Sequence, residues 1–431
     1  MNRPAIARLL ADYGMVFVLL LLCAFFSVVT LSEQHPTSEA AARKLAADLS
    51  GRVLIAVRDQ AEDAAFADRL AAELKARGVE VVAIVKGDPK AARTALNAVS
   101  GRLDAIACSP ASAQWLVFSD LPPALGSPRV VKSRAYRWPN FLKADNLLNI
   151  TNQIAVIAIV AVGMTMVIIA GGIDLSVGSL IALAAVISTL LIRDSAGSLN
   201  AGPLGMTLAC LAAILVCGGA GAISGTMVTV FKLPPFIVTL AMMLVASGSA
   251  YLLTLGQSVY QVPDSFVWLG RGADLFGIPN AVVLMALLYA LAHVLMSRMP
   301  LGRYIYAVGG NLEAARLSGI RVARVQLFTY TVSGLLAGLG GVIMASQLKS
   351  GAPSYGQMYE LYVIAAVVVG GASLSGGSGR MFGTLVGAFT IAVIQNGMNL
   401  TNVESYTQKV VLGLVILGAV LLDTWRARRG A

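Results

Sequence analysis

A series of long, nearly uninterrupted apolar segments constrains this chain more than any other feature. One segment runs from Tyr13 to Leu31, and the others follow residue 146. A helix that crosses a bilayer needs about 20 apolar residues, whereas the strands of an outer-membrane barrel alternate apolar and polar side chains. The pattern predicts an all-α polytopic membrane protein with about ten transmembrane helices. The later segments cover residues 147–170, 175–192, 204–230, 236–255, 280–297, 326–346, 360–374, 382–398 and 407–424.

Composition excludes several classes of protein. Only 13% of the residues are charged, whereas soluble domains have about 25%. The chain has four cysteines, three of them in apolar segments, and its only histidines are His35 and His293. We therefore expect no disulfide framework, no metal site and no resident cofactor. No lysine follows a glycine, so the phosphate loop GxxxxGK[ST] is absent, and if ATP drives this protein, another chain binds the ATP.

The charge is concentrated between the first and second apolar segments. Of the 32 Lys and Arg residues, 16 lie between His35 and Lys143, and 13 of the 22 acidic residues lie between Glu33 and Asp145. The net charge of +10 is thus divided between two unlike parts of the chain, which does not favour a nucleic-acid-binding protein. We expect residues 33–143 to form a separate insert.

The insert has the pattern of a small α/β fold. Residues 52–57 (RVLIAV), 79–85 (VEVVAIV) and 104–108 (DAIAC) are short apolar runs of the kind that forms buried strands. Apolar residues at helical spacing separate the first two runs, and Asp88 followed by Pro89 predicts a helix start before the third. This order predicts a βαβαβ unit with a small parallel sheet.

Arginine positions predict how the chain lies in the membrane. Arg3 and Arg8 precede the first helix, and the positive-inside rule places such residues in the cytoplasm. Ten crossings then put the basic loop 298–324 and the tail 426–431 in the cytoplasm as well, and the insert on the outer side. A cleavable signal peptide is the alternative for the first segment, but that segment is longer than the usual about 7 to 15 apolar residues. The expected parts are 1–32 (cytoplasmic tip and first helix), 33–143 (insert), 144–425 (membrane core) and 426–431 (tail).

One carboxylate interrupts the membrane core near its start. Asp174, in the sequence GGIDLSVGS, is the only ionisable residue between residues 154 and 192. Such a group is costly in a membrane unless it is hydrogen-bonded or reaches water. In one interpretation, Gly171 and Gly172 break a helix, and Asp174 with Ser176 caps the next helix. In the other, the break lines a translocation path, and Asp174 or Ser176 contacts a polar substrate.

A second copy of this motif lies about 200 residues later. Residues 370–378 (GGASLSGGS), which include Ser375, match the first copy at six of nine positions. The repeat indicates either two related halves, as in many transporters, or simply the small residues that close helix contacts favour. The predicted topology places both copies at the same side of the membrane. The glycine-rich stretch 334–341 favours close helix packing, with a flexible gate as the alternative.

The cytoplasmic loop 298–324 carries the most specific pattern, with five arginines against one acidic residue, Glu313. Residues 312–317 are predicted to form a short helix that begins after Asn311 as N-cap and ends before Gly319. So short a helix is not stable alone, so we expect it to dock onto another surface. The alternative is a basic loop that rests on lipid headgroups.

Several motifs in this order resemble the permease subunits of bacterial ABC importers for ribose, xylose, galactose and related monosaccharides. They are GGIDLSVGS, KLPPFIVTLAMM, PDSFVWLGRG, GRYIYAVGGNLEAARLSGIRV and YELYVIAAVVVGGASLSGG. The resemblance implies a ten-helix permease in the bacterial inner membrane, which works as two copies or two related permeases and receives its substrate from a periplasmic sugar-binding protein. It implies that ATP and Mg²⁺ bind to cytoplasmic ATP-binding subunits and that the insert is periplasmic. It also implies that the loop is the coupling helix received by the ATP-binding subunit. The matching residues are Gly309, Gly310, Asn311, Glu313, Ala314, Ala315, Arg316 and Gly319.

The insert departs from that family, whose members usually have a short connection after the first helix. Its pattern resembles a fragment of one lobe of a periplasmic sugar-binding protein. A docking or gating platform for the binding protein, a neutral passenger and a ligand sensor all remain open. For the whole chain, a secondary transporter or channel for a small polar solute and a membrane sensor that uses the insert are the alternatives.

Overall fold

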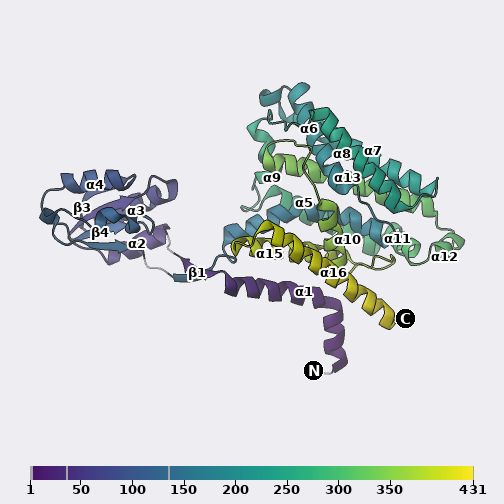
Figure 1. The fold of residues 1–431 in the computed structure, drawn as a ribbon, viewed down its shortest axis with the longest axis horizontal. Coiled ribbons are helices and arrows are strands. Elements are labelled where there is room, and N and C mark those ends of the chain that lie inside the picture. The colour runs from purple at the N-terminus through teal and green to yellow at the C-terminus, as the bar shows by residue number, and fades with distance from the viewer. Residues whose placement is uncertain (1–2, 35–36, 134–135, 431) are drawn as a thin grey trace. The chain divides into compact units, whose positions relative to one another are not determined.

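The computed structural model describes residues 3–34, 37–133 and 136–430 and divides the chain into two compact units (Figure 1). The membrane unit comprises Met1–Thr30 and Asn140–Ala431, and the insert comprises Leu31–Pro139. The insert thus begins two residues and ends four residues earlier than the expected 33–143.

The membrane unit is helical, because an apolar segment in lipid can satisfy its backbone hydrogen bonds only within a helix or a closed barrel. Among the described residues, seven helices are long and apolar enough to cross a bilayer, and three shorter apolar stretches accompany them: Gly14–Val29, Tyr359–Val369 and Ser405–Leu421. The helices of this unit are α1 (Arg3–Val29), α5 (Ala144–Ile169), α6 (Val177–Asp194), α7 (Pro203–Thr229), α8 (Pro235–Thr254), α9 (Trp268–Arg271), α10 (Asn280–Arg298), α11 (Pro300–Gly310), α12 (Leu312–Leu317), α13 (Val322–Leu348), α14 (Tyr359–Val369), α15 (Met381–Leu400) and α16 (Ser405–Gly430).

Helix α14 is shorter than its apolar sequence suggests. The sequence predicts a segment over 360–374, but the helix ends at Val369, and Gly371 then takes a left-handed conformation with φ +89°. Non-helical backbone fills 349–358 before α14 and 370–380 after it. Irregular backbone at membrane depth is tolerated only where protein buries it or where it lines a cavity. The surroundings of α14 are therefore candidates for a functional site.

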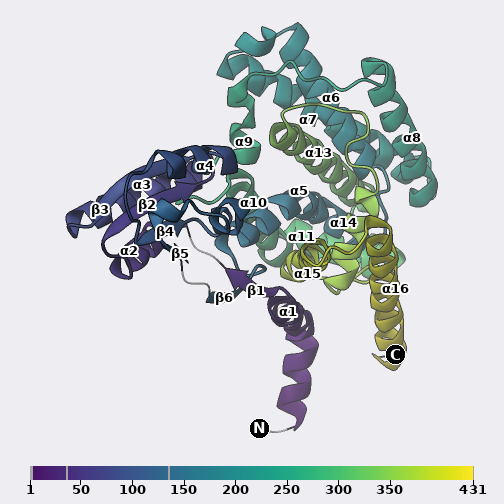
Figure 2. The same ribbon diagram turned by 60° about the vertical axis from the view of Figure 1, so that its left-hand side comes forward.

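Helix α13 packs closely against α5, α6 and α7 (Figure 2). A Cβ on Gly334 would overlap the carbonyl oxygen of Cys217 in α7, and one on Gly341 would overlap the carbonyl oxygen of Ile181 in α6. Glycine at these positions lets the helix backbones touch. The expected packing role of the 334–341 glycines is confirmed.

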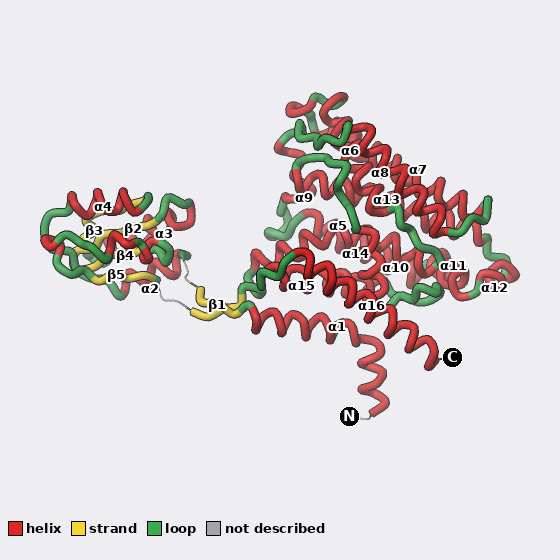
Figure 3. Tube along the Cα trace, viewed as in Figure 1, coloured by secondary structure: helices red, strands yellow, loops and turns green. Residues whose placement is uncertain are grey.

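The insert contains a four-stranded parallel sheet with the strand order β3-β2-β4-β5 (Figure 3). Alternate residues of β2 contribute to two buried clusters, one with α2 and α3 and the other with α4. Helices therefore cover both faces of the sheet, and β2 is buried on both sides, which explains its continuous apolar run. The elements are α2 (Glu39–Ala47), β2 (Arg52–Val57), α3 (Ala61–Ala76), β3 (Glu80–Lys86), α4 (Pro89–Ala98), β4 (Ala105–Cys108) and β5 (Arg129–Lys132).

Sequence reasoning missed α2, β5 and a second, two-stranded sheet. Strands β1 (Leu31–Gln34) and β6 (Tyr136–Pro139) pair antiparallel, with Leu31 opposite Pro139 and Gln34 opposite Tyr136. Each strand has only four residues, too few for alternation to be read from one strand alone. The pair brings together the points where the chain enters and leaves the insert.

Candidate functional site

Helix α12 occupies residues Leu312–Leu317, the range expected from the sequence. The Asn311 side chain accepts a hydrogen bond from the backbone N–H of Ala314 at 2.9 Å, and Gly319 follows in the left-handed region with φ +82°. Ala315 is buried, whereas Leu312 is 44% and Leu317 87% exposed. A six-residue helix that presents leucines to its surroundings is suited to contact with a further surface.

A second helix of the loop, α11 (Pro300–Gly310), was not expected from the sequence. Pro300 stands in its first turn, where a proline fits without cost, and Ile305 and Val308 form its buried face. These signals could have revealed it. The helix ends in Gly309 and Gly310 immediately before α12, so it connects α12 to the membrane unit.

Glycines from three segments meet at the end of α11. A Cβ on Gly309 would overlap the carbonyl oxygen of Ile169 at the end of α5. That same oxygen accepts a hydrogen bond from the backbone N–H of Gly377 at 2.9 Å. A Cβ on Gly376 would lie 3.1 Å from the Cα of Gly171. The backbones of α11 and of both motif copies therefore touch, and this contact is named the glycine junction (Gly171, Gly309, Gly310, Gly376 and Gly377).

The first motif copy follows α5 as a tight turn around a buried carboxylate. Gly171 adopts φ +83° and ends the helix. Asp174 is 1% exposed, and its Oδ1 accepts from the backbone N–H of Ser176 at 3.0 Å and from the Ser176 hydroxyl at 2.6 Å. Its Oδ2 accepts from the Ser333 hydroxyl of α13 at 2.7 Å. Asp174 thus connects the turn to α13.

This geometry corrects part of the capping interpretation. Ser176 precedes α6, but its side chain accepts no helix N–H, because the residue lies in the helical region (φ −78°, ψ −14°) rather than the extended conformation of an N-cap. Asp174 supports the helix start by fixing Ser176 instead. Asp174 and Ser176 are both 1% exposed, so neither side chain lines an open path in this conformation.

The second copy repeats the turn with one residue fewer. Gly371 takes the left-handed position that Gly171 takes in the first copy, 200 residues earlier. The Ser373 hydroxyl accepts from the backbone N–H of Ser375 at 3.3 Å, as Asp174 does from Ser176, but this pair is offset by 199 residues. The second copy therefore has one residue fewer than the first between the left-handed glycine and the side chain that accepts the hydrogen bond. Ser375 is exposed beside the glycine junction.

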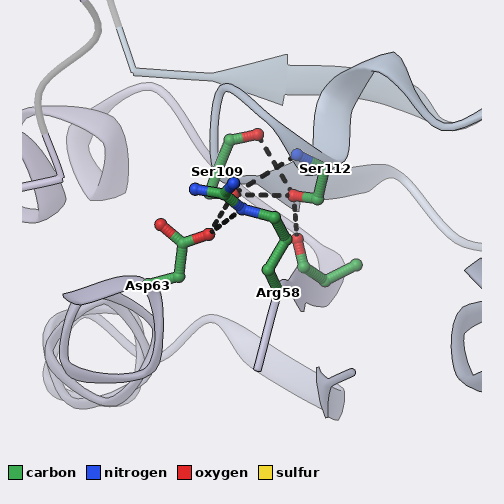
Figure 4. Close-up of polar contacts among 5 residues, drawn as sticks. Arg58, Asp63, Ser109 and Ser112 are labelled. Atoms are coloured by element: carbon green, nitrogen blue, oxygen red, sulfur yellow. Dashed lines mark hydrogen bonds and ion pairs between the residues drawn. The ribbon is translucent and has the colours of Figure 1, made fainter. Parts of the chain in front are cut away.

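The insert has its own polar cluster at the carboxyl ends of β2 and β4 (Figure 4). The Arg58 Nε donates to Asp63 at 2.9 Å, and the Ser109 hydroxyl donates to the same carboxylate oxygen at 3.0 Å. Ser112 donates to the carbonyl of Ala56 at 2.6 Å. These groups satisfy one another and tie α3 to two strands. Sequence reasoning missed the cluster, since the contacts that join its two halves, Asp63 to Ser109 and Ala56 to Ser112, span 46 and 56 residues.

The insert's single cysteine lies beside this cluster. Cys108 ends β4 and is fully buried, and burial raises the pKa of its thiol to about 12. The thiol therefore stays protonated and unreactive at neutral pH. Within the described residues, no three His, Cys, Asp or Glu side chains come together in a way that could hold a metal ion.

Comparison with known proteins places the chain in a family. The family model described as "Branched-chain amino acid transport system / permease component" matches residues 146–420. The chain belongs to this permease family. The matched range contains α12, the glycine junction and both motif copies, and it begins after the insert has ended.

Individual relatives of this permease are sugar permeases by name. It is 44% identical over 289 residues to the ribose import permease protein RbsC of Escherichia coli (strain K12). The aligned region covers 66% of this chain and 87% of the relative. It is 43% identical over 309 residues to the protein of that name in Bacillus subtilis (strain 168), covering 71% and 93%. It is 35% identical to the xylose transport system permease protein XylH of Escherichia coli (strain K12), covering 67% and 87%. No solved structure matches the permease significantly.

Proposed function

We propose that this chain is the membrane subunit of an ATP-driven importer that carries a monosaccharide from the periplasm to the cytoplasm. The observation that supports this most is the 44% identity to a ribose import permease over 87% of that protein. The exposed α12 supports it as well, because an importer whose membrane subunit lacks a phosphate loop needs a surface that receives an ATP-binding subunit.

The proposed topology has ten crossings in the bacterial inner membrane. Seven long apolar helices and three shorter apolar stretches supply that number among the described residues. With both termini in the cytoplasm, the arginine-rich 298–324 loop is cytoplasmic, as the positive-inside rule requires. The insert is then periplasmic.

The proposed partners follow from this orientation. A cytoplasmic ATP-binding subunit contacts α12 through the exposed Leu312 and Leu317 and the charges of Glu313 and Arg316. A periplasmic sugar-binding protein delivers the substrate, and a second copy of this chain or a related permease completes the transporter. ATP hydrolysis on the partner moves α12, and the glycine junction transmits that movement to both motif copies, which shifts the bundle between outward-open and inward-open states.

Charge removal on α12 tests the coupling role. In proteoliposomes that contain the permease, its ATP-binding subunit and its sugar-binding protein, we expect Glu313→Ala and Arg316→Ala to lower ribose or xylose uptake while basal ATPase activity and membrane insertion persist. Arg324→Ala is the matched control, because Arg324 is an exposed arginine in the first turn of α13, outside residues 309–320. Normal uptake by both α12 variants would refute the coupling assignment.

For the insert we propose a docking or gating role toward the sugar-binding protein. Its removal is a clean test, because β1 and β6 bring Gln34 and Tyr136 opposite each other, so a short linker can replace residues 37–133. We expect normal membrane abundance with weaker binding of the sugar-binding protein to the reconstituted complex. Unchanged binding and uptake would instead favour a neutral passenger. Intact uptake with a lost transcriptional response would favour a sensor.

A further inference from the structure

A cavity of about 300 Å³ lies between four helices of the membrane unit. Its walls come from the start of α5, the ends of α13 and α15, and the first residue of α14. It is therefore at the end of the bundle that joins the insert in sequence, which the proposed topology places on the periplasmic side. Tyr359, the lining residue from α14, directly follows the non-helical stretch 349–358, and such backbone at membrane depth needs a cavity or protein around it.

The polar lining of this cavity consists of uncharged side chains. Three amides, Gln153, Gln347 and Gln395, come from three different helices, and Tyr359 contributes a phenol. Among its described lining residues none is charged. The remaining surface includes apolar side chains such as Ile157 and Met344.

Two of the three amides have no hydrogen-bond partner among the residues that the structure describes. Gln347 Nε2 donates to the backbone oxygen of Asn152 at 3.0 Å and to its side-chain oxygen at 3.3 Å, which fixes that amide. No side-chain hydrogen bond joins Gln153 or Gln395 to any residue that the structure describes. Gln153 is exposed and Gln395 is half-buried, so both amides are available to hydrogen-bond to water or to a ligand that enters the cavity. The cavity can therefore hold a polar ligand.

The chemistry of the lining selects among polar ligands. An amide offers a donor and an acceptor side by side, which matches neighbouring hydroxyl groups that each donate and accept. A cation or an anion would find no opposite charge here to compensate for the free energy it loses when it leaves water. The apolar wall and the Tyr359 ring suit the C–H face of a sugar ring. The volume is at the small end of ligand pockets, which are about 300–1,000 Å³.

We propose that this cavity is a transit site that recognises a monosaccharide through hydroxyl contacts with Gln153 and Gln395, with Gln347 held in place by Asn152. The proposal rests on the proposed import function. It assigns sugar selectivity within the membrane to these amides, whereas the motif residues Asp174 and Ser176 are buried and form hydrogen bonds within the protein.

The test uses the complete transporter in proteoliposomes, with radiolabelled ribose and xylose as probes. We expect Gln153→Leu and Gln395→Leu each to lower uptake about tenfold, the size expected for a lost hydrogen bond. ATPase activity stimulated by the sugar-binding protein should stay, so more ATP is hydrolysed per sugar. The ratio of ribose to xylose uptake should also change, which a purely structural role would not cause. Gln257→Leu is the matched control, because Gln257 is exposed in the loop after α8, outside the cavity.

The outcomes separate this proposal from the proposed function. If the unaltered complex imports ribose or xylose and both leucine variants keep its rate and sugar ratio, the transit site is refuted and the import function stands. If the unaltered complex imports no monosaccharide, the proposed function itself fails, and the transit site with it.

Modification of an introduced thiol covers the case in which the leucine variants do not reach the membrane. In Gln395→Cys, a membrane-impermeant thiol reagent should block uptake, and excess ribose or xylose should slow the modification. The unaltered chain treated with the same reagent controls for Cys23 and Cys210, which are partly buried. Modification at the same rate with and without sugar would overturn the proposal.

Discussion

The two motif copies have the same turn but different attachments. Each turn has a left-handed glycine after its helix, Gly171 or Gly371, and each continues with a side chain that accepts a hydrogen bond from the backbone N–H two residues later. In the first copy that side chain is the buried Asp174, which also binds Ser333 of α13. In the second copy that side chain is Ser373, whose single hydroxyl lacks the two acceptor oxygens with which Asp174 binds two residues.

The second copy is attached to α11 instead. The Tyr306 hydroxyl of α11 donates to the carbonyl of Gly379 at 2.7 Å, and Gly377 packs against Gly310 with backbone in contact. Since α11 leads directly into α12, we infer that the second copy moves together with α12, whereas the first copy is held in place by α13. One turn is thus a fixed support and the other a moving part, joined at the glycine junction.

Filling the glycine junction should have the largest effect on this arrangement. Gly309→Val places side-chain atoms where Ile169 and Gly377 lie, and overpacking of this kind costs about 1–3 kcal/mol or more. We expect lower thermal stability in detergent and loss of coupled uptake. Gly310→Ala is the control, because a Cβ there meets nothing within 4 Å. Equal behaviour of the two variants would contradict a backbone contact at Gly309.

Removal of the buried carboxylate of Asp174 should have the second-largest effect. Asp174→Ala deletes the acceptor of hydrogen bonds from Ser176 and Ser333. The lost hydrogen bonds are three, from the N–H and hydroxyl of Ser176 and the hydroxyl of Ser333. A buried donor left without an acceptor costs about 1–3 kcal/mol, so we expect reduced membrane abundance and a lower unfolding temperature. Asp174→Asn keeps one acceptor oxygen and should lose less. Normal abundance of Asp174→Asn with an altered substrate preference would instead support the translocation-path interpretation of this residue.

These residues show which parts of the structure the sequence could predict. Local signals were sufficient for α12, because Asn311 and Gly319 mark its ends, and for β2, whose continuous apolar run reflects burial on both faces. The glycine junction and the amide cavity were not predictable. The junction brings together residues such as Ile169, Gly309 and Gly377, and the cavity brings together amides from three helices. In both cases the proximity depends on tertiary packing, which the periodicity of a sequence does not encode.

Loss of one hydrogen bond between α11 and the second copy should have a moderate effect. Tyr306→Phe removes the donor to Gly379, worth about 1 kcal/mol. If this bond helps the second copy to follow α11, the variant should remain folded but import less sugar for each ATP hydrolysed. Ser333→Ala, which loosens the first copy from α13, is the comparison. We expect it to lower stability more than coupling, and the reverse order would overturn the assignment of fixed and moving turns.

The smallest effects should come from the two left-handed glycines. A Cβ on Gly371 meets nothing within 4 Å, and one on Gly171 meets only the Cα of Gly309, at 3.9 Å. Steric overlap is therefore negligible at both sites, and Gly→Ala should cost only the strain of the left-handed backbone, about 1 kcal/mol at either position. Thermal unfolding of the two alanine variants in detergent measures this. Similar small shifts in unfolding temperature would show that the two turns have the same backbone requirement. A much larger loss of stability at one site would contradict the local equivalence of the two copies. It would mean that their attachments to α13 and α11 already differ at the left-handed glycine.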